Sequence, residues 1–219
     1  MKSVLSTKKL SPSQTEFLLN AGLSLVQYDA IKIEFVPFEA PSEVKNAIIT
    51  SQNAVRSIQN SEFRIQNCFC VGGKTKALLE ENGFRVIKMA EYASELADYL
   101  VKNHQNDSFH FFCGNIRSDE IPTRLKENNI ALREIEVYKT TLNPKKFERQ
   151  FDAILFFSPS GVKSFVANNS PLEGGVGGCL TVCIGTTTAS EAKKHTENVA
   201  IANATSVESV IAKAVKMLL

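Results

Sequence analysis

The 219-residue sequence lacks a long apolar run and lacks an excess of charge of either sign. No apolar stretch approaches the ~18 residues that a membrane-spanning helix needs, which excludes a transmembrane protein of that kind. The 25 basic and 23 acidic residues leave a formal net charge of +2, so the composition indicates neither a nucleic-acid partner nor a membrane partner. With 43% hydrophobic residues the chain is globular, and its length suits one or two domains.

We also expect neither an export signal nor a disulfide framework. Residues 1–10 (MKSVLSTKKL) are too short and too polar for a signal peptide, which predicts a cytoplasmic protein with reduced thiols. Cys68 and Cys70 fall on one face of a predicted strand, but the three histidines are scattered and supply no further zinc ligands. We therefore interpret these two cysteines, together with Cys179 and Cys183, as buried thiols, and we expect no metal site.

Three signatures of common enzyme classes are absent. The sequence has neither a G-x-G-x-x-G dinucleotide motif nor a G-x-S-x-G nucleophile elbow. Gly73-Lys74-Thr75 resembles the end of a P-loop, but Cys68 stands where that motif requires its first glycine. Ser158 and Ser160 have no evident histidine and acid partners, which argues against a hydrolase.

What the sequence does contain is a weak internal repeat. A shift of 107 residues aligns the first half of the chain with the second, and beyond residue 70 the shift becomes 113. The six additional residues fit the glycine-rich loop 171–178, where a chain tolerates insertion. The collinear order of the matches supports two related halves. The matched pairs include Leu18 and Leu125, Leu25 and Leu132, Pro37 and Pro144, Ser51 and Ser158, Ser57 and Ser164, Val71-Gly72 and Ile184-Gly185, Thr75 and Thr188, and Val86 and Val199.

Short apolar runs alternate with helix-forming segments along the chain. Strands separated by helices of about ten residues predict an α/β fold, with parallel sheets and helical crossovers. The predicted strands are Ser3–Thr7, Ala47–Thr50, Cys68–Val71, Val86–Met89, His110–Cys113, Ala153–Phe157, Thr181–Ile184 and Val199–Ala202. The predicted helices are one that opens at Ser11-Pro12, one over Lys74–Asn82 that ends before Gly83, and Glu95–Asn103, Asp119–Asn128, Gly161–Asn168, Ala189–His195 and Val207–Leu218.

Two longer extended stretches, Leu25–Val36 and Leu132–Leu142, each run into a proline. Because these prolines are equivalent under the repeat, we interpret both stretches as linkers that cross between domains. They divide the chain into a discontinuous α/β domain of residues 1–36 and 144–219 and an inserted α/β domain of residues 37–143. Two consecutive halves remain the alternative division.

Several predicted strands end in small polar residues that open a helix. In parallel α/β sheets, ligands bind at the carboxyl ends of strands, where free N–H groups of helix N-termini suit carboxylates or phosphates. Serine, threonine and asparagine are also ordinary helix caps, so one such cluster alone predicts only capping. Their recurrence in both halves predicts an anion-rich ligand in a shared cleft. The clusters are Thr50-Ser51-Gln52-Asn53, Gly72-Gly73-Lys74-Thr75, Gly114-Asn115, Ser158-Pro159-Ser160-Gly161 and Gly185-Thr186-Thr187-Thr188.

Tyr138 is one of four tyrosines and lies on the second extended stretch. A linker between domains borders the cleft, so the phenol of Tyr138 is placed to donate a proton there. The alternative is that Tyr138 only packs against its neighbours and has no chemical role.

In their order and spacing, these motifs resemble the uroporphyrinogen-III synthase family over nearly the whole chain. The resemblance implies two α/β domains joined by a two-stranded linker, one of them discontinuous. The motifs are Ile48-Ile49-Thr50-Ser51-Gln52-Asn53-Ala54-Val55, Val71-Gly72-Gly73-Lys74-Thr75, Cys113-Gly114-Asn115, Val137-Tyr138-Lys139-Thr140, Phe156-Phe157-Ser158-Pro159-Ser160-Gly161-Val162 and Ile184-Gly185-Thr186-Thr187-Thr188-Ala189.

The resemblance also implies the chemistry. The expected substrate is hydroxymethylbilane, a linear tetrapyrrole with eight carboxylates, which loses water and closes with ring D inverted, without a metal or organic cofactor. Tyr138 matches the family tyrosine that assists loss of the hydroxyl group as a general acid. The expected substrate-binding residues are Thr7, Lys8, Thr50, Ser51, Asn53, Gly72, Lys74, Thr75, Gly114, Asn115, Arg117, Ser158, Ser160, Gly161, Gly185, Thr187 and Thr188.

The sequence departs from the family pattern at two places, one of which is Lys76, where a small alanine is usual. Many members carry Thr-Arg-Pro after the first strand, whereas this chain has Thr7-Lys8-Lys9, and lysine lacks the bidentate fork of arginine. Two other functions stay open: a non-catalytic two-domain binding protein for an anionic small molecule, and a family member that keeps the fold as an interaction module. We expect a monomer that acts on a small-molecule tetrapyrrole, with no nucleic-acid or membrane partner.

Overall fold

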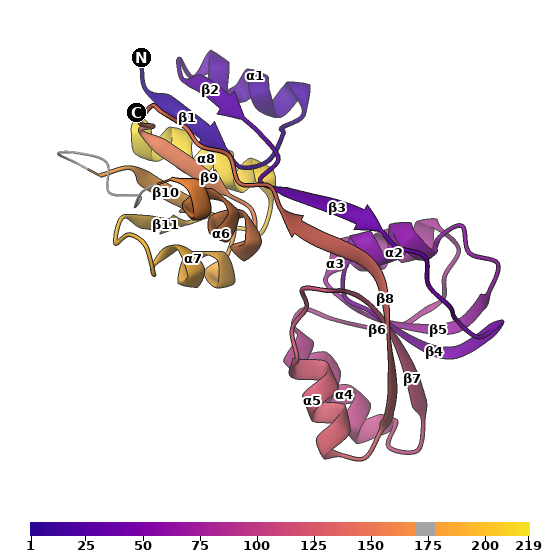
Figure 1. Cartoon of the computed structure of the whole chain (residues 1–219). Helices are drawn as coiled ribbons and strands as arrows, with labels where there is room; N and C mark the ends of the chain where they lie inside the picture. The colour runs from indigo at the N-terminus through magenta and orange to yellow at the C-terminus, as the bar shows by residue number, and fades with distance from the viewer. Residues whose placement is uncertain (170–177) are drawn as a thin grey trace. The chain divides into compact units, whose positions relative to one another are not determined.

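The computed structural model describes residues 1–169 and 178–219, which form two compact units. Unit 1 comprises residues 1–32 and 141–219, and unit 2 comprises residues 33–140. The predicted cuts, after residues 36 and 143, fall close to these divisions. Each unit is a largely parallel sheet with helices on its faces, so the predicted fold class is confirmed (Figure 1).

Unit 1 contains a five-stranded parallel sheet in the order β11-β10-β9-β1-β2. Its strands are β1 (Ser3–Ser6), β2 (Ser24–Gln27), β9 (Ala153–Phe156), β10 (Leu180–Cys183) and β11 (Val199–Ile201). Its helices are α1 (Pro12–Asn20), α6 (Pro159–Asn168), α7 (Thr186–Ala192) and α8 (Val207–Leu218). Apolar side chains of α6 and α7 pack with one face of this sheet, and those of α1 and α8 pack with the other.

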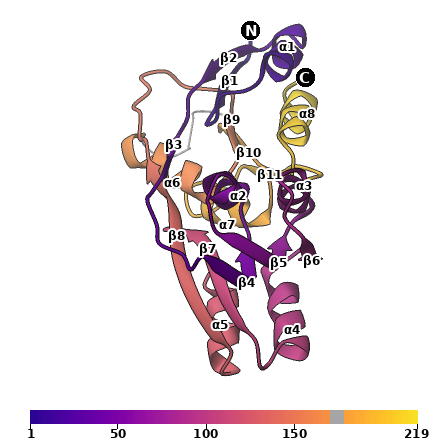
Figure 2. The same cartoon turned by 90° about the vertical axis from the view of Figure 1, so that its right-hand side faces the viewer.

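Unit 2 is built on a six-stranded sheet in the order β3-β8-β7-β4-β5-β6. Its strands are β3 (Ile31–Phe35), β4 (Glu43–Ile49), β5 (Arg64–Val71), β6 (Val86–Ala90), β7 (Ser108–Gly114) and β8 (Ala131–Leu142). Its helices are α2 (Gln52–Ile58), α3 (Gly73–Glu81), α4 (Ala93–Asn103) and α5 (Glu120–Glu127). Figure 2 shows α2 and α3 on one face of this sheet and α4 and α5 on the other, each pair over its own apolar cluster.

The two sheets have the same strand arrangement once unit 1 is read from β9. In that order β9, β10, β11, β1 and β2 correspond to β4, β5, β6, β7 and β8. One hydrogen bond repeats with the predicted shift of 107 residues: Val36 N donates to Val137 O over 3.2 Å, and Asn143 N donates to Ala30 O over 2.8 Å. The predicted repeat is therefore present in the topology. The insertion predicted over 171–178 falls, apart from Gly178, outside the described residues.

The two extended stretches cross between the units, as predicted, because the divisions after residues 32 and 140 fall within them, but they are more than linkers. The stretch Leu25–Val36 contains two strands, because β2 belongs to the sheet of unit 1 and β3 lies at the edge of the other sheet. The stretch Leu132–Leu142 lies within β8, which pairs with β7 as far as Tyr138. Extended residues of mixed polarity have the same pattern in a linker and in a strand of a sheet, so the sequence did not separate the two. Tyr138 thus lies in the sheet of unit 2.

The five cysteines are buried free thiols, as predicted for Cys68, Cys70, Cys179 and Cys183. Burial raises the pKa of Cys68 to about 12 and that of Cys70 to about 11, so both remain protonated at neutral pH. Within residues 1–169 and 178–219, no cluster of three His, Cys, Asp or Glu side chains is placed to hold a metal ion. None of the described helices is long and apolar enough to cross a membrane.

Gly83 ends α3 in the left-handed region, as its position after Lys74–Asn82 predicted, with φ of +78°. Substitution of Gly83 by alanine places a Cβ in that region and is expected to lower the free energy of unfolding by about 1 kcal/mol. Gly73→Ala is the matched control, because Gly73 has an ordinary φ and open space for a Cβ. Urea unfolding measures both variants, and equal losses would contradict this account of Gly83.

Candidate functional site

In each unit the direction in which the chain adds strands to the sheet reverses once. This reversal indicates where a ligand would bind. From β4 the chain continues to β5 on one side of the sheet, whereas from β7 it continues to β8 on the other. Ligands of open α/β sheets bind beyond the carboxyl ends of the two strands that flank such a reversal. In unit 2 those ends carry Thr50-Ser51 and Gly114-Asn115. In unit 1 the reversal lies between β9 and β1, whose ends carry Ser158 and Thr7.

A pocket of about 290 Å³ lies at the reversal in unit 2. It brings together five of the residues predicted from the sequence: Thr50, Ser51, Gly114, Arg117 and Tyr138. Sequence reasoning missed the other residues that line it, most of which are apolar. These are Val71, Ala93, Phe111, Cys113, Ile116, Ser118 and Ile121. They lie in the neighbouring strands, in the loop after β7 or at the start of α4 and α5.

Tyr138 lies with its hydroxyl group against Ser51. The phenol O–H donates to Ser51 Oγ over 3.1 Å, and the residue is only 7% exposed. Burial raises the pKa of Tyr138 above its ordinary value of 10.0, and the bond with Ser51 opposes part of that rise. The phenol therefore keeps its proton at neutral pH and can donate it within the pocket.

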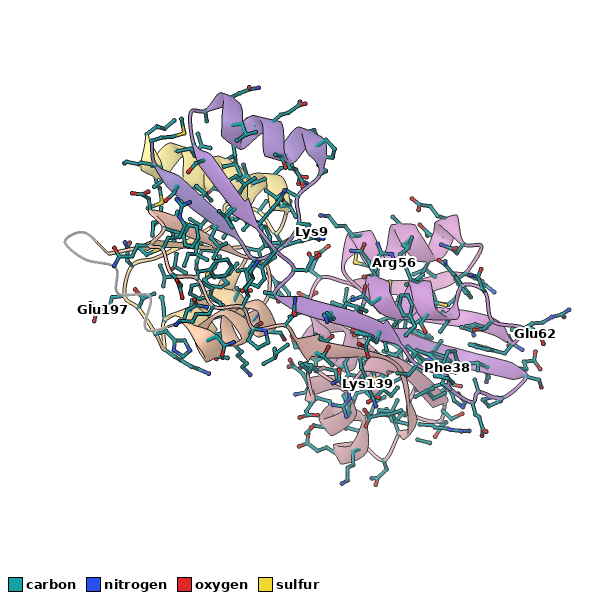
Figure 3. The ribbon with its side chains drawn as sticks, turned by 45° about the horizontal axis from the view of Figure 1, so that its top comes forward. Lys9, Phe38, Arg56, Glu62, Lys139 and Glu197 are labelled. Carbon is teal, nitrogen blue, oxygen red and sulfur yellow. The ribbon has the colours of Figure 1, made fainter. Side chains whose placement is uncertain are left out.

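Ser51 caps helix α2 and connects it to the phenol. Its Oγ accepts a hydrogen bond from Asn53 N over 3.1 Å as well as the bond from Tyr138. The hydroxyl proton of Ser51 remains free to turn, so it can donate to a phenolate if Tyr138 loses its proton. Asn53 contributes its backbone to this arrangement, and its side chain accepts from Arg56 Nη1. Arg56 on α2 and Lys139, which follows Tyr138 in β8, are both labelled in Figure 3.

Gly114 is required where the ring of Tyr138 crosses the end of β7. A Cβ on Gly114 would lie 2.5 Å from both Cε2 and Cζ of that ring, a distance that real Cβ contacts do not show. Gly114 therefore allows the ring of Tyr138 to pack against the backbone of β7. In this position the Tyr138 hydroxyl reaches Ser51. The predicted role of Gly114 in binding substrate stays a prediction.

Arg117 is the one charged side chain in the lining of this pocket. Its guanidinium pairs with Asp119 and Glu134, and the hydrogen bond to Asp119 and the charge of Glu134 raise its pKa, against the effect of burial. A substrate carboxylate would have to replace or join these partners. The role of Arg117 as a carboxylate ligand stays a prediction.

The remaining predicted residues of unit 2 lie outside the lining of the pocket. Gly72, with φ of +85°, precedes α3, where Lys74 is exposed and Thr75 is buried. Asn115 is exposed, and its side chain binds the backbone of Thr140 in β8.

The equivalent strand ends of unit 1 bring Thr7, Ser158 and Gly161 together. A Cβ on Gly161 would lie 3.4 Å from Ser158 Oγ and 3.5 Å from Thr7 Oγ1. Ser158 caps α6 by accepting from Gly161 N over 3.0 Å, and Thr7 Oγ1 donates to Leu155 O over 2.7 Å. The other predicted residues of this unit are Lys8 and Thr187, which are exposed, Ser160 and Thr188, which are buried, and Gly185, which precedes α7.

The sequence of this chain matches a known family over most of its length. The model of the family described as uroporphyrinogen-III synthase HemD covers residues 16–212. The chain belongs to this family. The resemblance found in the motifs is thereby confirmed.

Two curated relatives agree with this assignment. The chain is 29% identical over 150 residues to the uroporphyrinogen-III synthase of Saccharomyces cerevisiae, a match that covers 53% of this chain and 54% of the relative. It is 24% identical over 240 residues to the porphyrin biosynthesis protein HemD of Ruminiclostridium josui, a match that covers 94% of this chain and 46% of that protein. The chain thus spans about half the length of these curated relatives.

A solved structure shares the fold. The crystal structure of the uroporphyrinogen-III synthetase from Helicobacter pylori matches with a TM-score of 0.72 and 17% sequence identity, over 99% of this chain and 100% of that one. At this identity the match concerns the fold alone, and it covers both units of the uroporphyrinogen-III synthase family member described here.

Gly114→Ala tests the packing of Tyr138. The added Cβ displaces the ring, so we expect a loss of about 1–3 kcal/mol in the free energy of unfolding and a fall in the pKa of Tyr138 toward 10, because the ring becomes less buried. Urea unfolding and a pH titration of the tyrosine ¹³Cζ resonances measure the two effects. Gly185→Ala is the control, since its Cβ would meet only Thr205 Cγ2 at 3.5 Å. A Tyr138 pKa that is unchanged in Gly114→Ala would refute the contact.

Proposed function

We propose that this chain is a uroporphyrinogen-III synthase, a lyase that cyclises hydroxymethylbilane to uroporphyrinogen III with loss of water and inversion of ring D. One observation carries the proposal. In a chain that belongs to this family, the predicted acid Tyr138 lies in a pocket at the strand reversal of unit 2 and is hydrogen-bonded there to Ser51. The reaction belongs to tetrapyrrole (haem) biosynthesis.

In the proposed reaction Tyr138 acts on the hydroxymethyl group of the substrate. Its O–H proton goes to the departing hydroxyl, which leaves as water with the electron pair of the C–O bond. Ser51 then donates to the phenolate, while the backbone N–H of Asn53 holds the Ser51 oxygen in place. The proton that the pyrrole carbon releases on ring closure restores the phenol.

The enzyme's larger task is orientation, because unassisted closure gives the isomer without inversion. The pocket of about 290 Å³ is smaller than sites for drug-sized ligands, so we propose that it takes one part of the tetrapyrrole. Hydroxyl and N–H groups at the strand ends of both units are the proposed ligands of the carboxylates, since such groups suit anions. A cytoplasmic location and a monomeric state remain predictions.

The first test is the identity of the product. Purified protein given enzymatically made hydroxymethylbilane, without added cofactor, is expected to yield the type III isomer. Oxidation to porphyrins followed by chromatography separates types I and III. Type I product formed at the rate of the protein-free reaction would refute the proposed enzymatic activity. It would favour a binding protein or an interaction module instead.

The second test is Tyr138→Phe. Removal of a general acid typically costs 10²–10⁴-fold in rate, so turnover is expected to fall by at least about 10²-fold while the free energy of unfolding changes little. Tyr92→Phe is the matched control, because Tyr92 is 67% exposed and lies outside the lining of the pocket. If the two variants turn over alike, Tyr138 is not the acid.

A further inference from the structure

An irregularity in β8 determines the direction in which Tyr138 points. The pairing of β7 with β8 is regular from Ser108 opposite Ala131 to Cys113 opposite Glu136, but Gly114 then lies opposite Tyr138. One extra residue, Val137, is thus inserted in β8, which makes a β-bulge.

The bulge changes which side chains are buried. Side chains alternate between the faces of a regular strand, so Tyr138 would share the exposed side of Glu136. In the structure Val137 and Tyr138 are consecutive and both buried, in the cluster beneath α2 and α3. The extra residue therefore brings the phenol inward, to Ser51.

Backbone and side-chain partners hold both sides of the bulge. The carbonyl of Val137 accepts from Val36 N over 3.2 Å and from Ser57 Oγ over 2.7 Å. The carbonyl of Tyr138 accepts from Asn115 N over 3.3 Å. The two consecutive carbonyls are thus bound by partners from different parts of the unit.

The side chain of Asn115 continues this pairing beyond the end of β7. Its Oδ1 accepts from Thr140 N over 2.7 Å, and its Nδ2 donates to Thr140 O over 3.3 Å. One primary amide thereby satisfies both backbone groups of a β8 residue, as a neighbouring strand would do. This contact fixes the register of β8 two residues after Tyr138.

We infer that Asn115 is a positioning residue, whose amide locks the bulge in β8 and so aims the Tyr138 hydroxyl at Ser51. This inference rests on the proposed function of Tyr138. It replaces the predicted role of Asn115 as a substrate ligand, because both polar atoms of its side chain are already bound to Thr140.

The internal repeat provides a comparison within the molecule. The residues of unit 1 that stand 107 positions before Asn115 and Tyr138 are Lys8 and Ile31. A lysine ammonium has no acceptor and cannot make the paired bonds of an amide. Unit 2 thus has both the asparagine and the tyrosine. Unit 1 has neither residue at the two equivalent positions.

The experiment compares Asn115→Ala with the wild-type protein by two readouts. Without the amide the register of β8 loosens and the ring of Tyr138 becomes less buried, so its pKa is expected to fall toward 10, as followed by ¹³Cζ resonances of labelled tyrosine. The Tyr138→Phe spectrum assigns the resonance. Turnover of hydroxymethylbilane is expected to fall about 10- to 100-fold because of misplacement, with KM within about two-fold of wild type.

A substrate-binding role predicts the opposite pattern, with a raised KM and an unchanged Tyr138 pKa, and that result would overturn the inference. Asn103→Ala is the matched control and is expected to change neither readout, because the amide of Asn103 donates to Tyr99 O within α4. Asn115→Asp keeps the acceptor for Thr140 N and is expected to be intermediate, and it stands in if the alanine variant does not fold. The pKa comparison needs no substrate, so it decides the positioning role even if the wild-type protein proves inactive.

Discussion

Parallel strand pairing is the constraint on which the rest of this molecule depends. Parallel neighbours must be joined by crossovers, so most strands are followed by a helix, and the carboxyl ends of the parallel strands of a sheet meet at one edge. In each unit the chain leaves two central strands in opposite directions, which opens one place at that edge. Thr50 and Ser51, which precede α2, lie there for this reason, and the pocket of unit 2 is found at that place.

Within that pocket, close packing gives a tyrosine a defined direction. The absence of a side chain at Gly114 allows the ring to cross the strand end, and the bulge at Val137 turns it inward. Burial then keeps the phenol protonated, while Ser51 supplies a hydroxyl that can meet the charge left by proton loss. One strand irregularity and one glycine thus place a protonated phenol where the fold already favours ligands.

The elements that the sequence predicted best are those with a local cause. The predicted strand Val86–Met89 is observed as β6 (Val86–Ala90), and the end of α3 is marked by Gly83, whose positive φ suits glycine. Both extended stretches cross between the units, as predicted, but they also form strands of the sheets, and an extended pattern of mixed polarity does not separate the two cases. Thr50, Ser51, Gly114, Arg117 and Tyr138 were predicted as site residues, but most of the apolar lining, such as Phe111 and Ile121, belonged to no motif.

The sequence by itself determined the alternation of strands and helices, the 107-residue repeat, the buried thiols and the family, since these depend on residue types and their spacing. Only the tertiary structure decided the strand orders, the membership of Tyr138 in a sheet, its hydrogen bond to Ser51 and the paired contact of Asn115 with Thr140. These depend on register between segments far apart in the chain, and a shift of one residue turns a side chain to the opposite face. The shift in β8 is defined by its pairing with β7, a strand that lies elsewhere in the chain.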